Sequence, residues 1–485
     1  MVSLVETNYY QKVDRKKLIY SSIRGMLQSL DPHSYFLDPD HFARLREEQV
    51  GKYYGLGIMI QKQEDRLVVI SPIEGGPASR LGIQAGDIIS EINGQSTKSI
   101  TSFEAMQKLR GPKGTKVEIT IVREGLDKPF KVTIVREEIS LHSVPYAFLL
   151  QKDIGYIFIR NFSSTTTKEF EEKMKQLVSQ GMKKLILDLR GNGGGTFVQS
   201  IEISDEFLPK GSPIVSIRGR NKYYNKEFEA LNNSQYENLP LVILIDRGTA
   251  SAPEIVSGAI QDNDRGLIVG ENSWGKGLVQ TVFPLAPNIA VALTTAKYFT
   301  PSGRSIQRDY THPEDYYLNK KVPPKQREVR YTRKGRKVLG EGGISPDYKV
   351  EYSFQKLTAS LLLKGVFFSY GQKFVRHKTP LSKKFIFPDK SSSSQNVYEG
   401  KKVIDHNFVV DNQVLEDFKN YLKNNKIKYN AEEFAAAKEE IKRELKREIF
   451  SSLWGLEEGL KAYRKSDSVV LKAIEVLPEA EKLIS

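Results

Sequence analysis

Short apolar runs alternate with helical patterns through the middle of the chain. Leu185–Leu189 and Pro240–Asp246 are continuous apolar runs of the length expected for buried strands. Between them, Thr166 and Glu169 form a capping-box pattern at the start of an amphipathic helix. Strand and helix patterns in this order predict an α/β core over residues 139–352.

The regions around this core show other patterns. Residues 1–50 carry apolar side chains at helical spacing, so we expect a helical N-terminal region. Residues 311–340 are polar and rich in tyrosine and proline, which predicts a surface excursion from the core. Residues 353–410, which include the serine run 391–394, are expected to form a linker region. Residues 411–485 have an uneven apolar stripe that predicts a helical extension, which packs on the protein or mediates self-association.

Charge and composition exclude several classes of protein. The net charge is +14, but no nucleic-acid-binding module accompanies it, so we interpret the basic runs at Arg330–Lys337 and Lys442–Arg447 as a solvated face. Cysteine is absent, which excludes disulfides and cysteine-bound metal. No apolar run approaches the length of about eighteen residues that a membrane-spanning helix needs, and no signal peptide is visible.

Ser251 follows the second apolar run, after a break at Gly248, and precedes a helical pattern that starts near Pro253. It should therefore lie at a strand-to-helix turn, where backbone N–H groups and the helix dipole favour an anion. None of the six histidines has a convincing site-like setting, although His33 attracts attention. Lys276, between Gly275 and Gly277, is the better candidate for a base. Without further evidence, a helix-capping serine and a solvated lysine would be the preferred interpretation of these residues.

Residues 248–266 and 269–285 resemble the active-site signature of the C-terminal processing proteases, also called tail-specific proteases. The resemblance implies that Ser251 is the nucleophile, Lys276 the base and Gln280 the third member, with Glu254 as an auxiliary residue that some members emphasise. Pro253 stands where serine is common in the family. The blocks LDPHS at 30–34, TPSGRSIQ at 300–307 and GISPD at 343–347 match in the family's order, and the first is structural there.

A lysine serves as a base only when its amine is neutral. An ordinary lysine has a pKa of about 10.4, so we expect burial to lower the pKa of Lys276. We also expect no carboxylate to pair closely with its amine, because such a pair would raise the pKa. Gln280, a neutral group, suits the position beside the amine for the same reason.

A glycine-rich turn follows the first apolar run, at residues 190–195. Its spacing fits neither the Walker pattern nor the dinucleotide fingerprint. It resembles the family's Asp-Leu-Arg-x-Asn-x-Gly-Gly motif, which implies an oxyanion hole built from the N–H of Gly195, or of its neighbour Gly194, and the N–H of Ala252. Fixed N–H dipoles stabilise the alkoxide that develops in the transition state.

Residues 51–138 resemble a PDZ domain. The sequence Gly55-Leu56-Gly57-Ile58 is similar to its carboxylate-binding loop, and residues 71–97 are similar to its core. Successive N–H groups in such a turn can bind the terminal carboxylate of a peptide that adds to a sheet edge. Arg110 is a further candidate for contact with the docked tail.

Together these patterns indicate a multidomain α/β protein. Its core resembles the crotonase-like sandwich of the tail-specific proteases, with an inserted β-rich PDZ domain and a helical C-terminal extension. The predicted function is a serine endopeptidase that binds substrate C-termini and cuts by a Ser–Lys acyl-enzyme mechanism without a metal or organic cofactor. The alternatives are a catalytically silent PDZ scaffold or adaptor and an α/β enzyme with acyl chemistry on non-peptide substrates.

The resemblance also implies where the protein works and what it meets. Members of the family act in the bacterial periplasm or cell envelope. This chain starts inside the family's first helical region, so we expect a mature or trimmed form there. Its partners should be proteins or peptides with accessible C-termini. An adaptor or a second copy could bind the C-terminal helices.

Overall fold

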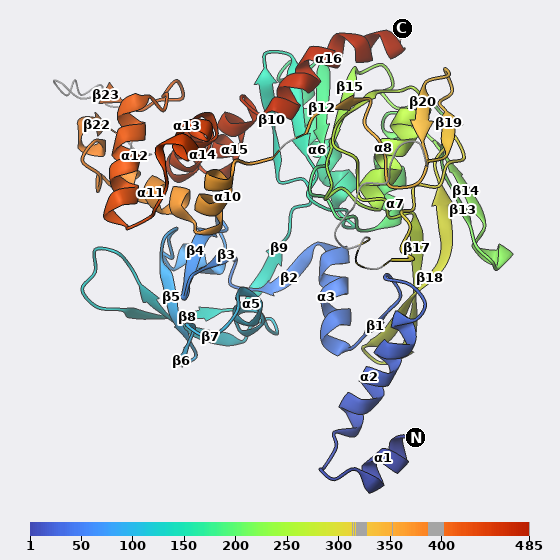
Figure 1. The fold of residues 1–485 in the computed structure, drawn as a ribbon, viewed down its shortest axis with the longest axis horizontal. Helices are drawn as coiled ribbons and strands as arrows, with labels where there is room; N and C mark the ends of the chain where they lie inside the picture. The colour runs from blue at the N-terminus through green and yellow to red at the C-terminus, as the bar shows by residue number, and fades with distance from the viewer. Residues whose placement is uncertain (313, 315, 317–326, 352, 387–401, 485) are drawn as a thin grey trace. The chain divides into compact units, whose positions relative to one another are not determined.

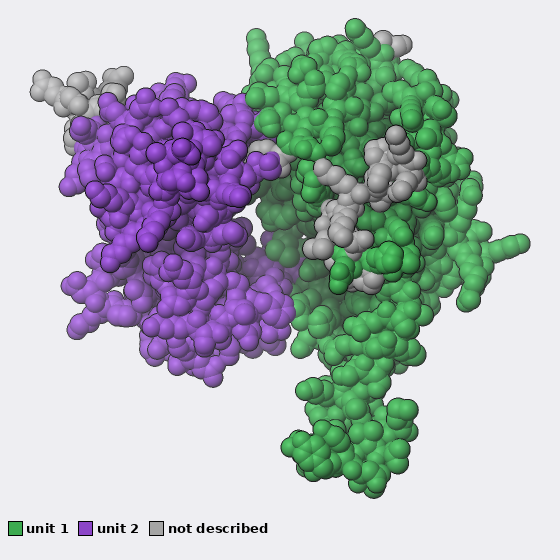
Figure 2. All heavy atoms as spheres, in the orientation of Figure 1, with its two compact units in different colours: residues 1–51, 141–352, 468–485 green, residues 52–140, 353–467 purple. Residues whose placement is uncertain are grey.

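The structure, a computed structural model, describes the whole chain apart from residues 313, 315, 317–326, 352, 387–401 and 485 (Figure 1). The chain forms two compact units. Unit 1 contains residues 1–51, 141–352 and 468–485, and unit 2 contains residues 52–140 and 353–467 (Figure 2). Each unit therefore combines segments that are far apart in the sequence.

The centre of unit 1 is a six-stranded sheet in the order β10-β11-β12-β15-β16-β21. Its strands are β10 (Tyr146–Gln151), β11 (Ile154–Phe158), β12 (Lys184–Asp188), β15 (Leu241–Ile245), β16 (Leu267–Gly270) and β21 (Tyr348–Lys349). All neighbours pair in parallel except β10 with β11. Strands of this kind are buried on both faces and are apolar throughout, as the sequence pattern of β12 and β15 predicted.

Helices cover both faces of this sheet (Figure 1). On one face, α6 (Thr166–Ser179), α7 (Phe197–Asp205) and α8 (Ala252–Asp262) share an apolar core with alternate strand residues such as Leu187 and Ile243. The other alternate residues, such as Val242, are also fully buried, and α16 (Ser468–Ile484) packs along β12, β15 and β16.

A second, antiparallel sheet in unit 1 surrounds the long strand β18 (Ile289–Phe299). Along one edge, β18 pairs with β17 (Leu278–Ala286). It also pairs with β1 (Tyr35–Leu37) and with β13 (Pro213–Arg218). Strand β13 in turn pairs with β14 (Lys226–Glu229). The remaining elements here are α1 (Val2–Asn8), α2 (Arg15–Gln28), α3 (Pro39–Val50), η1 (Lys222–Tyr224) and a hairpin of β19 (Val329–Tyr331) and β20 (Lys337–Leu339). The N-terminal region is thus helical except for β1, which follows Pro32. The hairpin lies in the predicted excursion, part of which is outside the described residues.

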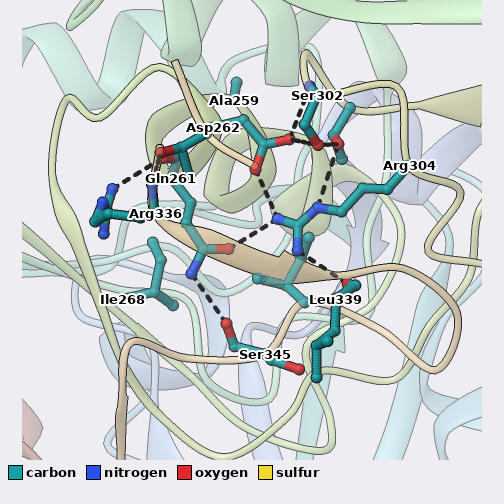
Figure 3. Close-up of polar contacts among 12 residues, drawn as sticks. Ala259, Gln261, Asp262, Ile268, Ser302, Arg304, Arg336, Leu339 and Ser345 are labelled. Carbon is teal, nitrogen blue, oxygen red and sulfur yellow. Dashed lines mark hydrogen bonds and ion pairs between the residues drawn. The ribbon is translucent and has the colours of Figure 1, made fainter. Parts of the chain in front are cut away.

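A buried polar network fixes the C-terminal end of α8 (Figure 3). The guanidinium of Arg304, in the TPSGRSIQ block, donates to Asp262 at 2.7 Å and to Gln261 at 2.8 Å. The side chains of Arg304 and Asp262 are fully buried. Asp262 also accepts from the hydroxyl of Ser302, and Arg336 donates to the backbone oxygen of Gln261. This network fixes the helix whose other end carries Ser251.

In unit 2, the predicted PDZ domain is a sheet in the order β3-β4-β5-β7-β8, with β6 on β5. The elements are β3 (Ile58–Gln63), β4 (Arg66–Pro72), β5 (Ile88–Ile92), β6 (Gln95–Ser96), β7 (Lys116–Val122), β8 (Phe130–Val135), α4 (Pro77–Arg80) and α5 (Ser102–Leu109). The paired strands β2 (Lys52–Gly55) and β9 (Glu137–Ser140) stand at its entry and exit. In this sheet β3 is an edge strand.

The rest of unit 2 is mainly helical, and its first part differs from the expected linker. The segment contains α10 (Lys356–Leu363), α11 (Val366–Val375), η3 (Ser382–Lys384), β22 (Phe385–Ile386), β23 (Lys402–Val403), α12 (Asn412–Asn424), α13 (Ala431–Ala436), α14 (Lys438–Trp454) and α15 (Leu456–Arg464). Phe367 and Phe374 of α11 pack with Phe418 and Leu445 in one core, so residues 353–386 are part of a folded module. The predicted break at 391–394 lies outside the described residues.

The C-terminal extension is divided between the two units. Its helices α12 to α15 belong to the module in unit 2, which contacts the PDZ domain where Arg376 donates to the carbonyl of Ala85 at 2.8 Å. The last helix, α16, belongs to unit 1, where Lys184 pairs with Glu481 at 3.0 Å. Among the helices that the structure describes, none is long and apolar enough to cross a bilayer.

Candidate active site

Ser251 lies at the N-cap of α8, directly after the turn that follows β15. Its backbone has φ 66° and ψ −115°, a positive φ that is uncommon outside glycine and is found where function requires strain. The turn is held because Asp246 accepts from the N–H of Gly248 at 2.8 Å, and the N–H of Ala250 donates to the carbonyl of Asn192 at 2.9 Å. The predicted strand-to-helix position of Ser251 is therefore the observed one.

The fully buried carboxylate of Glu254 ties Ser251 to Lys276. One oxygen accepts from the N–H of Ser251 at 2.7 Å and from the N–H of Lys276 at 2.9 Å. The other accepts from the hydroxyl of Ser273 at 2.5 Å and from the N–H of Gly275 at 2.7 Å. Burial raises the pKa of Glu254, and these donated hydrogen bonds oppose the rise. Glu254 thus fixes the backbone at both candidate catalytic positions.

Lys276 is placed by the two glycines beside it. A Cβ at Gly275 would lie 2.7 Å from the backbone nitrogen of Gly343, so any other residue there would collide with backbone. A Cβ at Gly277 would lie 3.0 Å from the backbone nitrogen of Gln307, a tight contact that also favours glycine. The hydroxyl of the buried Tyr298 donates to the carbonyl of Lys276 at 2.7 Å. Sequence reasoning did not identify Tyr298, which lies in an ordinary strand pattern.

The electrostatic setting of the Lys276 amine makes the neutral form more accessible than in an ordinary lysine. Burial lowers the pKa of Lys276, while the negative charges of Glu254 and Asp31 oppose that effect. Glu254 contacts the backbone of Lys276, and within the described part of the chain no ion pair involves the amine. Burial and the charge of Lys276 lower the pKa of His33 to about 4, against the opposing charge of Asp31. His33 pairs through Nε2 with the hydroxyl of Tyr316.

The geometry distinguishes between the two glycines proposed for the oxyanion hole. The N–H of Gly194 donates to Asn192 at 2.9 Å and is therefore occupied. Over the described residues, no hydrogen bond is recorded for the N–H of Gly195 or for that of Ala252, the first residue of α8. Gly195 has φ 142°, and a Cβ there would lie 1.9 Å from the carbonyl oxygen of Phe162. Gly195 is consequently the better candidate.

A single cavity brings the predicted residues together. It has a volume of about 850 Å³ and is lined by Ser251, Lys276, Gln280, Ala252 and residues 193–195, with apolar side chains that include Ile255, Leu278 and Val282. The side-chain nitrogen of Gln280 donates to the hydroxyl of Thr294 at 3.3 Å. Thr294 and Asp31, like Ser273 and Asn192, were not predicted, because their roles depend on contacts between distant segments.

A second cavity, of about 280 Å³, lies in the PDZ domain between β3 and α5. It is lined mainly by apolar side chains, namely Tyr53, Leu56, Ile58, Ile60, Phe103, Met106 and Leu109, together with Ser102 and Arg110. The guanidinium of Arg110 stacks on the ring of Tyr53 at 4.1 Å. Gly57 has φ 68°, which gives the predicted carboxylate-binding loop its turn. Gly55 lies close to the same tyrosine ring, since a Cβ there would be 2.7 Å from it.

Comparison with known proteins agrees with the predicted family and fold class. Residues 153–316 match peptidase family S41, residues 45–122 match the PDZ domain, and residues 383–455 match a family of unknown function. A carboxy-terminal-processing protease of Bartonella bacilliformis is 41% identical over 360 residues, which cover 73% of this chain and 81% of that protein. A carboxy-terminal processing protease of Bacillus subtilis is 35% identical over 311 residues, 64% and 66% of the two chains.

The fold and these matches define a serine-type peptidase with a PDZ domain. The chain belongs to the carboxy-terminal processing proteases of peptidase family S41. Among solved structures, the photosystem II D1 C-terminal processing protease is similar, with 29% identity, a TM-score of 0.40 and coverage of 75% of this chain and 89% of that one. The predicted family and fold class are confirmed.

Proposed function

We propose that this chain is an endopeptidase in which Ser251 attacks the substrate carbonyl and Lys276 is the general base. The observation that carries the proposal is the Glu254 carboxylate, which binds the backbone N–H groups of both residues. A single buried group thereby holds the backbone of the proposed nucleophile and that of its base in fixed relative positions. Positioning of this kind accounts for a large share of catalysis when reactants are held in place.

In the proposed reaction, the neutral amine of Lys276 takes the proton of the Ser251 hydroxyl as the oxygen bonds to the carbonyl carbon. The N–H groups of Gly195 and Ala252 stabilise the negative oxygen of the tetrahedral intermediate. The ammonium then protonates the leaving amine as the peptide bond breaks, which leaves an acyl ester on Ser251. A water molecule activated by the same amine hydrolyses the ester. Gln280 orients the amine through its side-chain amide.

We further propose that the PDZ groove binds substrate C-termini. The edge strand β3 offers backbone groups to an added peptide strand, and the loop at Leu56 and Gly57 offers N–H groups to a terminal carboxylate. The apolar lining beside Ile58 and Met106 suits an apolar final side chain. Arg110 lies at this end of the groove and adds positive charge.

The experiment that tests the catalytic proposal uses an unfolded reporter protein and mass spectrometry of its fragments. Wild type should cut internal peptide bonds, whereas Ser251→Ala and Lys276→Ala should not. The double variant should be no worse than either single variant, because the two residues act as a unit. Strong cleavage by purified Ser251→Ala would contradict the assignment. Folded, inactive wild type would instead favour the scaffold alternative.

A binding experiment tests the groove separately. A labelled peptide with an apolar C-terminus should bind wild type and lose affinity when its carboxylate is amidated. Met106→Asp places a charge in the groove and should weaken binding, whereas Gln107→Asp, on the exposed side of the same helix, is the matched control. Equal binding of the free and amidated peptides would contradict C-terminal recognition.

We also propose that the protein works in the bacterial cell envelope, where it meets exposed C-termini. The similar proteases of Bartonella, Bacillus and Synechocystis support a bacterial setting. Fractionation of the source cells followed by immunoblotting tests this location. Recovery of the protein only in the cytosolic fraction would contradict it.

A further inference from the structure

The side-chain amide of Gln280 stands at the end of a hydrogen-bonded chain that leaves the active-site cavity. Gln280 on β17 pairs in register with Thr294 on β18. Its nitrogen Nε2 donates to the Thr294 hydroxyl at 3.3 Å, and that hydroxyl donates to Oδ1 of Asp31 at 3.1 Å. Asp31 is in the loop before β1, so three separate segments meet here.

The carboxylate of Asp31 determines the donor-to-acceptor direction of these hydrogen bonds. It also accepts from the N–H groups of His33 and Ser34 and from the hydroxyl of Ser34. Burial pushes the pKa of Asp31 up, but the bonds from Ser34, His33 and Thr294 outweigh it and hold the pKa below its ordinary value. Asp31 is therefore ionised at neutral pH and can only accept hydrogen bonds.

The orientation of the Gln280 amide follows from this polarity. A threonine hydroxyl has one proton, and here Asp31 receives it. Thr294 must then accept from Gln280, which selects the NH₂ end of the amide and turns the carbonyl oxygen away from Thr294. An amide without such a partner could present either end to the cavity.

We propose that Asp31 and Thr294 are positioning residues for the peptidase reaction, which orient Gln280 so that its carbonyl oxygen accepts from the amine of Lys276. This inference rests on the proposed Ser–Lys function. An oriented acceptor directs the amine N–H away from Ser251 and leaves the nitrogen lone pair for the serine proton. The LDPHS block, interpreted from the sequence as structural, thereby orients Gln280 through two hydrogen bonds and acts on the base through a third.

Asp31 has a second, electrostatic effect that can be separated from the first. Within the described residues, the titratable groups that interact with Lys276 are Glu254 from α8, Asp31 and His33 from the loop before β1, and Tyr298 from β18, whose hydroxyl donates to the backbone carbonyl of Lys276. Glu254 and Asp31 oppose the lowering of the Lys276 pKa. Removing the charge of Asp31 while keeping its acceptor should therefore lower that pKa.

Substitution of Thr294 tests the geometric part. Thr294→Val keeps the shape, and kcat should fall on the order of 10-fold to 100-fold with KM unchanged, since the lost interaction positions the base rather than the substrate. Thr294→Ser should restore the rate. Thr295→Val is the matched control, because the hydroxyl of Thr295 pairs with Thr281 instead. A normal kcat in folded Thr294→Val would overturn the inference.

A double-mutant cycle separates positioning from a general structural effect. If Thr294 acts through Gln280, Thr294→Val should cause no further loss in a Gln280→Ala background. Additive losses would overturn the inference and leave the proposed function intact. Full activity of Gln280→Ala alone would instead remove Gln280 from the proposed mechanism, and with it the role of Thr294.

The electrostatic part is tested with Asp31→Asn, which retains an oxygen acceptor for Thr294. Its kcat should reach the plateau at a lower pH than that of wild type, because the Lys276 amine loses a nearby negative charge. Melting temperature identifies any loss of folding from the altered bonds to Ser34. An unchanged pH profile in a folded Asp31→Asn variant would overturn the role of the Asp31 charge.

Discussion

Replacing Glu254 with glutamine changes one atom of the group that joins the two candidate catalytic residues. Its oxygens accept from Ser251, Lys276, Ser273 and Gly275. Glutamine keeps one oxygen and offers an NH₂ group in place of the other. The NH₂ is best tolerated beside Ser273, whose hydroxyl can turn and accept, so the N–H of Gly275 is left without its partner.

The magnitude follows from these contacts. An unsatisfied buried donor costs about 1–3 kcal/mol, and each of the two bonds to the remaining oxygen, from Ser251 and Lys276, loses about 1 kcal/mol as a charged acceptor becomes neutral. Relief of a buried charge offsets part of this sum. We expect a net loss of about 3 kcal/mol, or a fall in Tm of roughly 6–12 °C for a unit of this size. The shift of Ser251 and Lys276 should lower kcat on the order of 100-fold.

The assay combines kcat for a fluorogenic peptide with thermal and denaturant unfolding of Glu254→Gln. Glu172→Gln, on the exposed side of α6, is the control for loss of one carboxylate. Wild-type kcat and stability in Glu254→Gln would refute the reasoning, since the buried carboxylate would then hold neither residue in place. A folded variant with lowered stability, normal KM and reduced kcat would support it.

Three other predictions test separate parts of the structure. Because burial lowers the pKa of Lys276, wild-type activity should rise with pH through a pKa below that of free lysine. Lys276→Arg should be inactive at every pH, and Gln280→Glu should move the profile to higher pH; an active arginine variant or an unmoved profile would contradict this. Arg304→Ala leaves the buried charge of Asp262 unpaired and should cost about 3–5 kcal/mol in a denaturant titration; a loss below 1 kcal/mol would argue against the network. Deletion of residues 468–485 uncovers one face of the central sheet. Because each buried side chain contributes about 1.5–3 kcal/mol, the deletion should prevent folding of unit 1. A truncated protein with unchanged circular dichroism and Tm would disprove this role.

The local part of the active site could be predicted from the sequence. Ser251 follows an apolar strand and precedes a helix, and Gly275 and Gly277 mark a close backbone approach at Lys276. These are short-range signals that periodicity and turn chemistry express directly. The glycine-rich turn at 190–195, the candidate oxyanion hole, is readable for the same reason, although only the hydrogen bond from Gly194 to Asn192 favours Gly195.

The remaining parts depend on contacts between distant segments. Asp31 and Thr294 are far apart in the chain and meet because β1, which follows Asp31, pairs with β18, which carries Thr294; the pairing of β17 with β18 adds Gln280. The linker expected at 353–410 contains α11, whose Phe367 and Phe374 are buried only because α12 and α14 supply the opposite surface. The apolar stripe of α16 shows that it needs a partner but not that the partner is the central sheet.

Direct detection of an acyl group on Ser251 tests the central claim of the mechanism. Wild type is mixed with an excess of an activated peptide ester, quenched in acid within milliseconds to seconds, digested and measured by mass spectrometry. The account predicts an acyl adduct on the peptide that contains Ser251, absent in Ser251→Ala and formed far more slowly in Lys276→Ala. An adduct on another residue, or turnover of the ester by Ser251→Ala at the wild-type rate, would contradict it.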